Sequence, residues 1–140
     1  MPLITRTFIK TSLVYFVLAL IAGLLTAVAR IISLPPVFNR LTPVYFHLLM
    51  VGWVTLMIMG VAFWMFPRFT KELPRGHIWL MWAAYGLINA GLILRVIAEP
   101  MLGLTAGAMP WGELLAVSAL TQWLGGLCFV ANVWPRLQER

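Results

Sequence analysis

Long apolar stretches, separated by short polar or proline-containing connections, dominate the chain. Each stretch has about 20 mainly apolar residues, the length that an α-helix needs to cross the hydrocarbon core of a bilayer. The four stretches cover approximately residues 11–34, 44–66, 78–98 and 111–134. This pattern predicts an all-α protein that forms a single transmembrane domain over residues 1–140.

Prolines mark the ends of the predicted helices. Pro36 follows the first stretch, Pro67 the second, Pro100 the third and Pro135 the fourth. Proline lacks the N–H that would continue a helix and disfavours helical geometry in the residue before it. Because the connections are short, we expect successive helices to be antiparallel neighbours in an up-down-up-down four-helix bundle.

The composition excludes an ordinary soluble domain. Of the 140 residues, 62% are hydrophobic and 10% are charged, and the mean hydropathy is +0.95. Soluble domains have a charged fraction near ~25%. The lipid bilayer is therefore the expected surroundings of the helices.

The net charge of +6 is explained by membrane topology, and we do not expect nucleic-acid binding. The basic residues on the side shared by the two termini and the second connection are Arg6, Lys10, Arg68, Lys71, Arg75, Arg136 and Arg140. Only Arg30, Arg40 and Arg95 fall on the other side. Positive residues favour the cytoplasmic face, so both termini are predicted to be cytoplasmic.

His47 is the most informative residue because it lies inside the second apolar stretch. An ionisable side chain in a transmembrane segment is costly and marks a candidate functional site. Imidazole is also a good axial ligand for heme iron. His47 lies five residues after Thr42, where the helix is expected to start. At 1.5 Å per residue it is roughly 7 Å into the helix, in the outer third of the membrane.

Arg30, Arg40 and Arg95 lie on the same outer side as His47, which favours a heme b site. Arginine offers planar, bidentate donors suited to the propionates of a heme. Gly52 would allow close approach of a flat macrocycle or of another helix, and helix packing is the commoner use. A zinc or copper site would need several His, Cys or carboxylate ligands, which the predicted helices do not supply.

Structural alternatives exist for each of these residues. His47 is as consistent with a hydrogen-bonded packing residue as with a ligand. Arg40 suits a side chain that reaches the membrane interface. An ion pair between Arg95 and Glu99, four residues apart, would account for both.

Because His47 is the only histidine at this depth, a six-coordinate heme would need a second ligand from elsewhere. A two-fold axis perpendicular to the membrane would place the His47 residues of two copies at equal depth. We therefore expect a homodimer that shares a heme. The alternatives are one five-coordinate heme per chain and a methionine as sixth ligand.

Two runs in the second helix carry a resemblance to a known family: residues 40–53 (RLTPVYFHLLMVGW) and 57–68 (MIMGVAFWMFPR). They resemble the second transmembrane helix of heme-copper oxidase catalytic subunits, closest to the C-family oxidases and nitric oxide reductases. In that family a histidine near the outer end of this helix ligates the low-spin heme, and a Gly-Trp pair often follows. The resemblance implies that His47 is an axial ligand of heme b and that the outer arginines meet the propionates.

The chain also departs from that family. The catalytic subunits have far more helices, and this chain lacks further histidines for copper, for a high-spin heme or for the second low-spin ligand. Oxygen or nitric oxide reduction of the family type is therefore not expected. The resemblance implies a small relative in a bacterial-type inner (plasma) membrane, with a respiratory or denitrification complex as a partner.

The leading hypothesis is a membrane heme b protein that transfers electrons or binds O2 or NO, without catalytic activity of its own. The alternative is a heme-free accessory or assembly subunit of a respiratory oxidase or nitric oxide reductase. A small transporter ranks last, because no acidic residue lies deep in a predicted helix.

Overall fold

The computed structural model describes residues 1–72, 74–102, 104 and 110–137, and helices are its only regular elements in this part of the chain. The first membrane-spanning helix is α1 (Leu3–Ala29). The second is continuous over Thr42–Met65 and consists of α2 (Thr42–His47), the π-helical η2 (Leu48–Thr55) and α3 (Leu56–Met65). The remaining elements are α4 (Ile78–Met101), α5 (Trp111–Val133) and two short 3-10 helices, η1 (Pro36–Arg40) and η3 (Trp134–Leu137).

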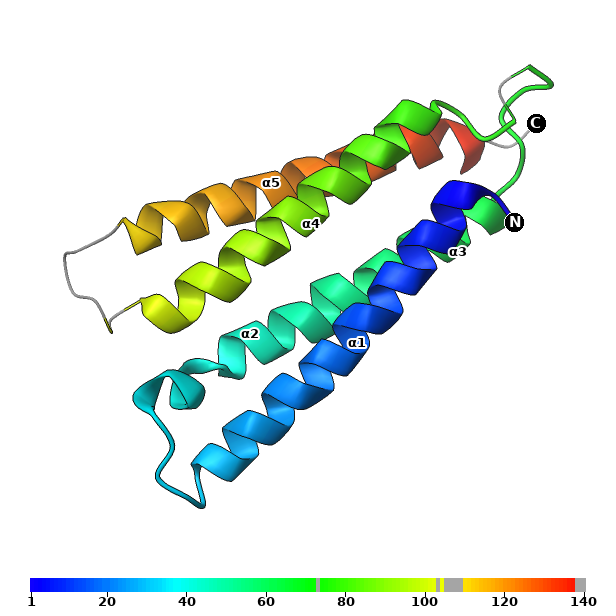
Figure 1. The fold of residues 1–140 in the computed structure, drawn as a ribbon. Helices are drawn as coiled ribbons and strands as arrows, with labels where there is room; N and C mark the ends of the chain where they lie inside the picture. Colours follow the sequence, from blue (N-terminus) through cyan, green and yellow to red (C-terminus); the bar gives the residue numbers. More distant parts are fainter. Residues whose placement is uncertain (73, 103, 105–109, 138–140) are drawn as a thin grey trace.

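Four helices are long and apolar enough to cross a membrane, so the prediction of an all-α protein with four spans is confirmed. They form two hairpins: α1 packs along the second span, and α4 packs along α5 (Figure 1). The start of α1 and the end of η3 lie at one end, and η1 lies at the other. The cytoplasmic location of the termini stays a prediction, and Arg140, which counted toward it, lies outside the described residues.

The first predicted helix boundary is wrong: α1 begins at Leu3, not near residue 11, and ends at Ala29. Ile4 and Phe8 are buried in the core, whereas Arg6 and Lys10 are exposed on the same turns. The prediction counted continuous apolar residues, and Arg6 and Lys10 interrupt that count. It therefore missed a helical first part of α1 that has an apolar face toward the core and a charged face outward.

The predicted end of the third helix is also wrong, because α4 continues past residue 98 to Met101 and includes Pro100. The backbone N–H of Leu102 still donates to the carbonyl of Ala98, at 3.0 Å. Proline in this last turn loses only its own backbone donor without stopping the helix. As a result, Glu99 belongs to the helix and lies mostly buried at its end.

The apolar core joins α1, α3 and α4 through one buried cluster: Ile4, Phe8, Leu56, Met59, Phe63, Met81, Ile88 and Leu92. By contrast, α4 and α5 meet through small residues. A Cβ built on Gly91 would lie 2.8 Å from the carbonyl oxygen of Ser118, and one on Gly125 would lie 2.7 Å from Ile88. Small residues allow two membrane helices to approach closely and pack backbone against backbone.

Hydrogen bonds between tyrosines and polar side chains link the two hairpins inside the membrane-spanning region. The hydroxyl of Tyr15 on α1 donates to the Oδ1 of Asn89 on α4, at 2.6 Å. One turn away, the hydroxyls of Thr11 and Tyr85 share a hydrogen bond of 2.8 Å. These bonds satisfy polar groups that lipid cannot solvate and set the register of α1 against α4.

Candidate functional site

His47 is the last residue of α2 and stands directly before the π-helical segment η2. Its Nδ1 lies 2.9 Å from the carbonyl oxygen of Pro43, one turn earlier, and its side chain is 29% exposed. A carbonyl can only accept, so this contact is a hydrogen bond when Nδ1 carries the proton. That tautomer leaves the lone pair of Nε2 for a ligand-binding role.

The ring of His47 also approaches an ion pair on α4. Glu99 Oε2 lies 3.8 Å from His47 Nδ1, and Glu99 Oε1 lies 3.3 Å from Arg95 Nη1. The Arg95–Glu99 pair expected from the spacing along the helix is therefore present. Both side chains are mostly buried, with 16% and 14% exposure, which makes each charge dependent on the other.

Arg95 continues the polar contacts from α4 to α5. Its Nε donates to the Oγ of Ser118 at 3.4 Å, and the Ser118 hydroxyl donates to the carbonyl of Gly91 at 2.6 Å. We call His47, Glu99, Arg95 and Ser118 the His47 network. It connects three helices at one end of the bundle and involves both hairpins.

One atom of this network lacks a hydrogen bond within the described part of the chain. Glu99 Oε2 is buried, and the 3.8 Å that separates it from His47 Nδ1 is too long for a hydrogen bond. A buried carboxylate oxygen without a donor is unusual in proteins, and a bound water or ion is one explanation for it. The sequence predicted Glu99 only as the ion-pair partner of Arg95. The structure also places its carboxylate beside His47.

The three outer arginines differ in their surroundings. Arg30 is exposed at the end of α1, and Arg40 donates from Nη1 to the carbonyl of Leu102 at 2.7 Å. Arg95 is held by Glu99 and Ser118. The structure therefore brings only Arg95 to His47, through Glu99, whereas Arg30 and Arg40 keep N–H groups at the surface.

Gly52 packs against α1. A Cβ at this position would lie 2.8 Å from both Cβ and Cγ of Tyr15. The space beside Gly52 is thus filled by a tyrosine, in the close helix packing named as the commoner use of such a glycine. The same Tyr15 that packs against Gly52 donates its hydroxyl to Asn89 on α4. Gly52 therefore helps to position the hydrogen bond that links the two hairpins.

The π-helical segment was not predicted. Within it, the hydroxyl of Thr55 donates to the carbonyl of Met50, five residues earlier, at 2.8 Å. Long π-helical stretches are rare, and π-bulges occur frequently at functional sites. The available sequence signals were Gly52, which favours backbone freedom, and Thr55, whose hydroxyl competes for a backbone carbonyl.

A groove of about 470 Å³ lies between α1 and α2, with Arg30 in its wall. Gly23, Tyr45 and Phe46 are among its lining residues, and His47 is not. His47 therefore faces away from the groove, toward Glu99.

No group of three or more His, Cys, Asp or Glu side chains could hold a metal ion within residues 1–72, 74–102, 104 and 110–137. A single axial histidine needs no such group. No family model matches the chain, and searches of curated proteins and of solved structures find no match. The relation to heme-copper oxidases thus stays a prediction carried by residues 40–68.

Proposed function

We propose that the chain is a membrane heme b protein in which His47 is an axial ligand and which transfers electrons or binds O2 or NO. The supporting observation is the contact of 2.9 Å between His47 Nδ1 and the Pro43 carbonyl. Histidines that bind metals almost always donate their other ring N–H to a carbonyl, carboxylate or water. This second hydrogen bond fixes the tautomer and the orientation of the ring.

The residues around His47 fit a heme held at the surface of the bundle better than one enclosed within a single chain. The imidazole ring of His47 is partly exposed, and Tyr15 fills the space beside Gly52. A second copy related by a two-fold axis would cover the exposed ring edge and supply the sixth ligand from its own His47. The proposed heme therefore joins two protomers.

A bound heme would supply the one-electron or gas-binding chemistry, and this chain would supply its position and charge balance. His47 would hold the iron through Nε2. Arg30 and the remaining donors of Arg40 are the groups available for propionates. Arg95 is assigned to Glu99 and not to a propionate.

An optical spectrum tests this proposal. The protein is expressed with a heme precursor, purified in a mild detergent and measured before and after dithionite reduction, with and without carbon monoxide. We expect a Soret band and a reduced α band. A sharp α band without a carbon monoxide shift indicates two axial ligands, and a shift indicates an open position.

The matched variants are His47→Ala and His77→Ala, because these are the only histidines. His47→Ala should lose the heme, and added imidazole should restore part of the Soret band, whereas His77→Ala should keep it. Size-exclusion profiles and helical circular dichroism check that both remain folded. Wild-type protein without a Soret band under full heme supply, or equal heme in both variants, would overturn the proposal.

The second candidate is a heme-free accessory subunit of a respiratory oxidase or nitric oxide reductase. It is favoured by the His47 network, which gives His47 a structural role beside the buried Glu99. Purification of the tagged chain from its native membranes would then bring down a larger oxidoreductase. His47→Ala would change neither the spectrum nor the amount of that partner.

A further inference from the structure

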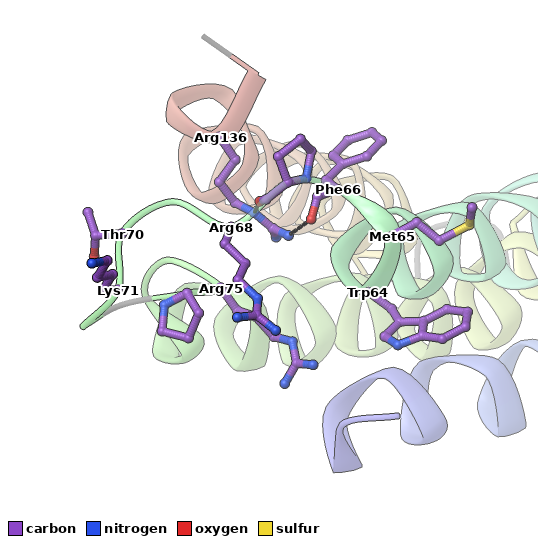
Figure 2. Close-up of a pocket in the computed structure, with 10 residues that line it drawn as sticks. Trp64, Met65, Phe66, Arg68, Thr70, Lys71, Arg75 and Arg136 are labelled. Atoms are coloured by element: carbon purple, nitrogen blue, oxygen red, sulfur yellow. Dashed lines mark hydrogen bonds between the residues drawn. The ribbon is translucent and has the colours of Figure 1, made fainter. Parts of the chain in front are cut away.

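The end of the bundle opposite the His47 network has a cavity whose wall is strongly basic (Figure 2). It has a volume of about 750 Å³ and lies between the end of α3, the connection to α4 and η3. Four of its lining residues are cations: Arg68, Lys71, Arg75 and Arg136. None of the described residues that line it is acidic.

Arg136 is the most deeply placed of these cations. Arg136 is 3% exposed, and its guanidinium donates to three backbone carbonyls. Nε donates to Pro67 at 3.0 Å, and Nη2 donates to Phe63 at 3.1 Å and to Phe66 at 2.7 Å. The guanidinium also lies 5.5 Å from the centre of the Phe63 ring. These contacts satisfy carbonyls that the end of α3 leaves without partners.

All of these acceptors are neutral, so the charge of Arg136 is not compensated by them. Its Nη1 is buried and makes no hydrogen bond to the described residues. A buried, uncompensated cation is costly, and a bound anion would lower that cost.

The connection that carries the other cations is held in place on α5 and η3. Gly76 has a φ of +67° and lies against Asn132. The amide of Asn132 donates to the carbonyl of His77 at 2.6 Å, and the N–H of Phe69 donates to the carbonyl of Pro74 at 3.1 Å. Figure 2 shows the side chains of Arg68 and Arg75 extending in the same direction. A preorganised basic site binds an anion with a smaller loss of conformational entropy in the protein.

We propose that this cavity binds a phosphate group, and that the phosphate is the headgroup of an anionic phospholipid. Arginine guanidinium groups match phosphate oxygens in geometry and charge. Trp64 and Met65 border the cavity on α3 and are 48% and 68% exposed, which gives an acyl chain an apolar surface beside the headgroup. Basic pockets at the ends of membrane helices bind anionic lipid headgroups in this way.

Native mass spectrometry of the delipidated protein, titrated in detergent, separates the sources of phosphate. The probes are phosphatidylglycerol, phosphatidylcholine as the lipid without net charge, inorganic phosphate and glycerol 3-phosphate. We expect a saturable complex with phosphatidylglycerol and much weaker complexes with the others. Tight binding of a soluble phosphate alone would overturn the lipid assignment, and no saturable binding of any probe would overturn the site.

The test variant is Arg68→Gln/Arg75→Gln, and its matched control is Arg6→Gln/Lys10→Gln. Both remove two positive charges from the same end of the bundle, but Arg6 and Lys10 are exposed and do not line the cavity. Phosphatidylglycerol affinity should fall about ten-fold or more in the first variant and change little in the second. Equal losses would indicate general attraction to a basic surface and would overturn the proposal.

Arg136→Lys tests the deepest group while keeping its charge. Lysine cannot reproduce the planar donors that contact phosphate and the α3 carbonyls together, so affinity should fall here too. If this variant does not fold, the outcome rests on the Arg68→Gln/Arg75→Gln comparison, which leaves the α3 carbonyl contacts of Arg136 intact.

Discussion

Each end of the bundle contains an arginine with little exposure, Arg95 mostly buried and Arg136 buried, but the two side chains have different partners. Arg95 meets the carboxylate of Glu99, whereas Arg136 donates to three backbone carbonyls and lies over the Phe63 ring. The first arrangement balances its charge internally. The second uses Nε and Nη2 for three carbonyls, leaves Nη1 without a hydrogen bond and includes no carboxylate among the described residues. Both arginines make hydrogen bonds, but among the described residues only Arg95 has a carboxylate partner, and this difference is the basis of the anion site proposed at the Arg136 end.

The largest expected effect is at the Arg136 end. Arg136→Ala removes the donors of three carbonyls and should lower the free energy of unfolding by about 3 kcal/mol, because buried acceptors lose their partners. Thermal unfolding in detergent, followed by circular dichroism, measures this. Arg6→Ala is the exposed control. A loss no greater than that of Arg6→Ala would contradict the structural role of Arg136.

The second largest loss of stability is expected where α4 and α5 pack closely, near Arg95. Gly91→Ala would place a methyl group 2.6 Å from Gln122 Cγ and 2.8 Å from the Ser118 carbonyl oxygen. The two helices must separate, so we expect a loss of about 2 kcal/mol. Gly126→Ala is the control, because no atom lies within 4 Å of its added Cβ. Its stability should be unchanged or slightly higher, since alanine favours helix over glycine.

A smaller effect is expected from breaking the charge balance of Arg95. Glu99→Gln keeps the shape of the side chain but leaves Arg95 mostly buried without its counter-ion, at a cost of about 1–2 kcal/mol. The double variant Arg95→Gln/Glu99→Gln should regain part of this loss, because no unpaired charge remains. Additive losses in unfolding experiments would show that the pair is not coupled.

The smallest stability effect should come from His47. In heme-free protein, His47→Gln should change the free energy of unfolding by ~1 kcal/mol or less, because it removes one hydrogen bond to the Pro43 carbonyl and the 3.8 Å approach to Glu99 is longer than a hydrogen bond. A clearly larger loss in chemical unfolding would assign His47 to the structure of the bundle. Together with the heme spectra, this measurement separates a ligand from a packing residue.

The sequence predicts the spans well because a bilayer imposes a length and a polarity that can be counted along the chain. It also predicts the Arg95–Glu99 pair, because that contact lies within one helix. It misses the start of α1, where Arg6 and Lys10 interrupt an apolar face. It also misses the role of Arg136, whose carbonyl partners are about seventy residues away along the chain. Local contacts follow from spacing, and contacts between distant segments need the packed fold.

The π-helical segment determines how the residues before it in the second span are rotated about the helix axis relative to the residues after it. Each residue of an α-helix turns the chain by about 100°. A π-helical turn closes over more residues than an α-helical turn, so converting Leu48–Thr55 to α-helix at unchanged length would rotate His47 relative to Gly60, which packs against Phe8 on α1. Either the Phe8 contact or the approach to Glu99 would then be lost. The π-helical geometry of this one segment therefore determines whether the same helix can face α1 at one end and α4 at the other.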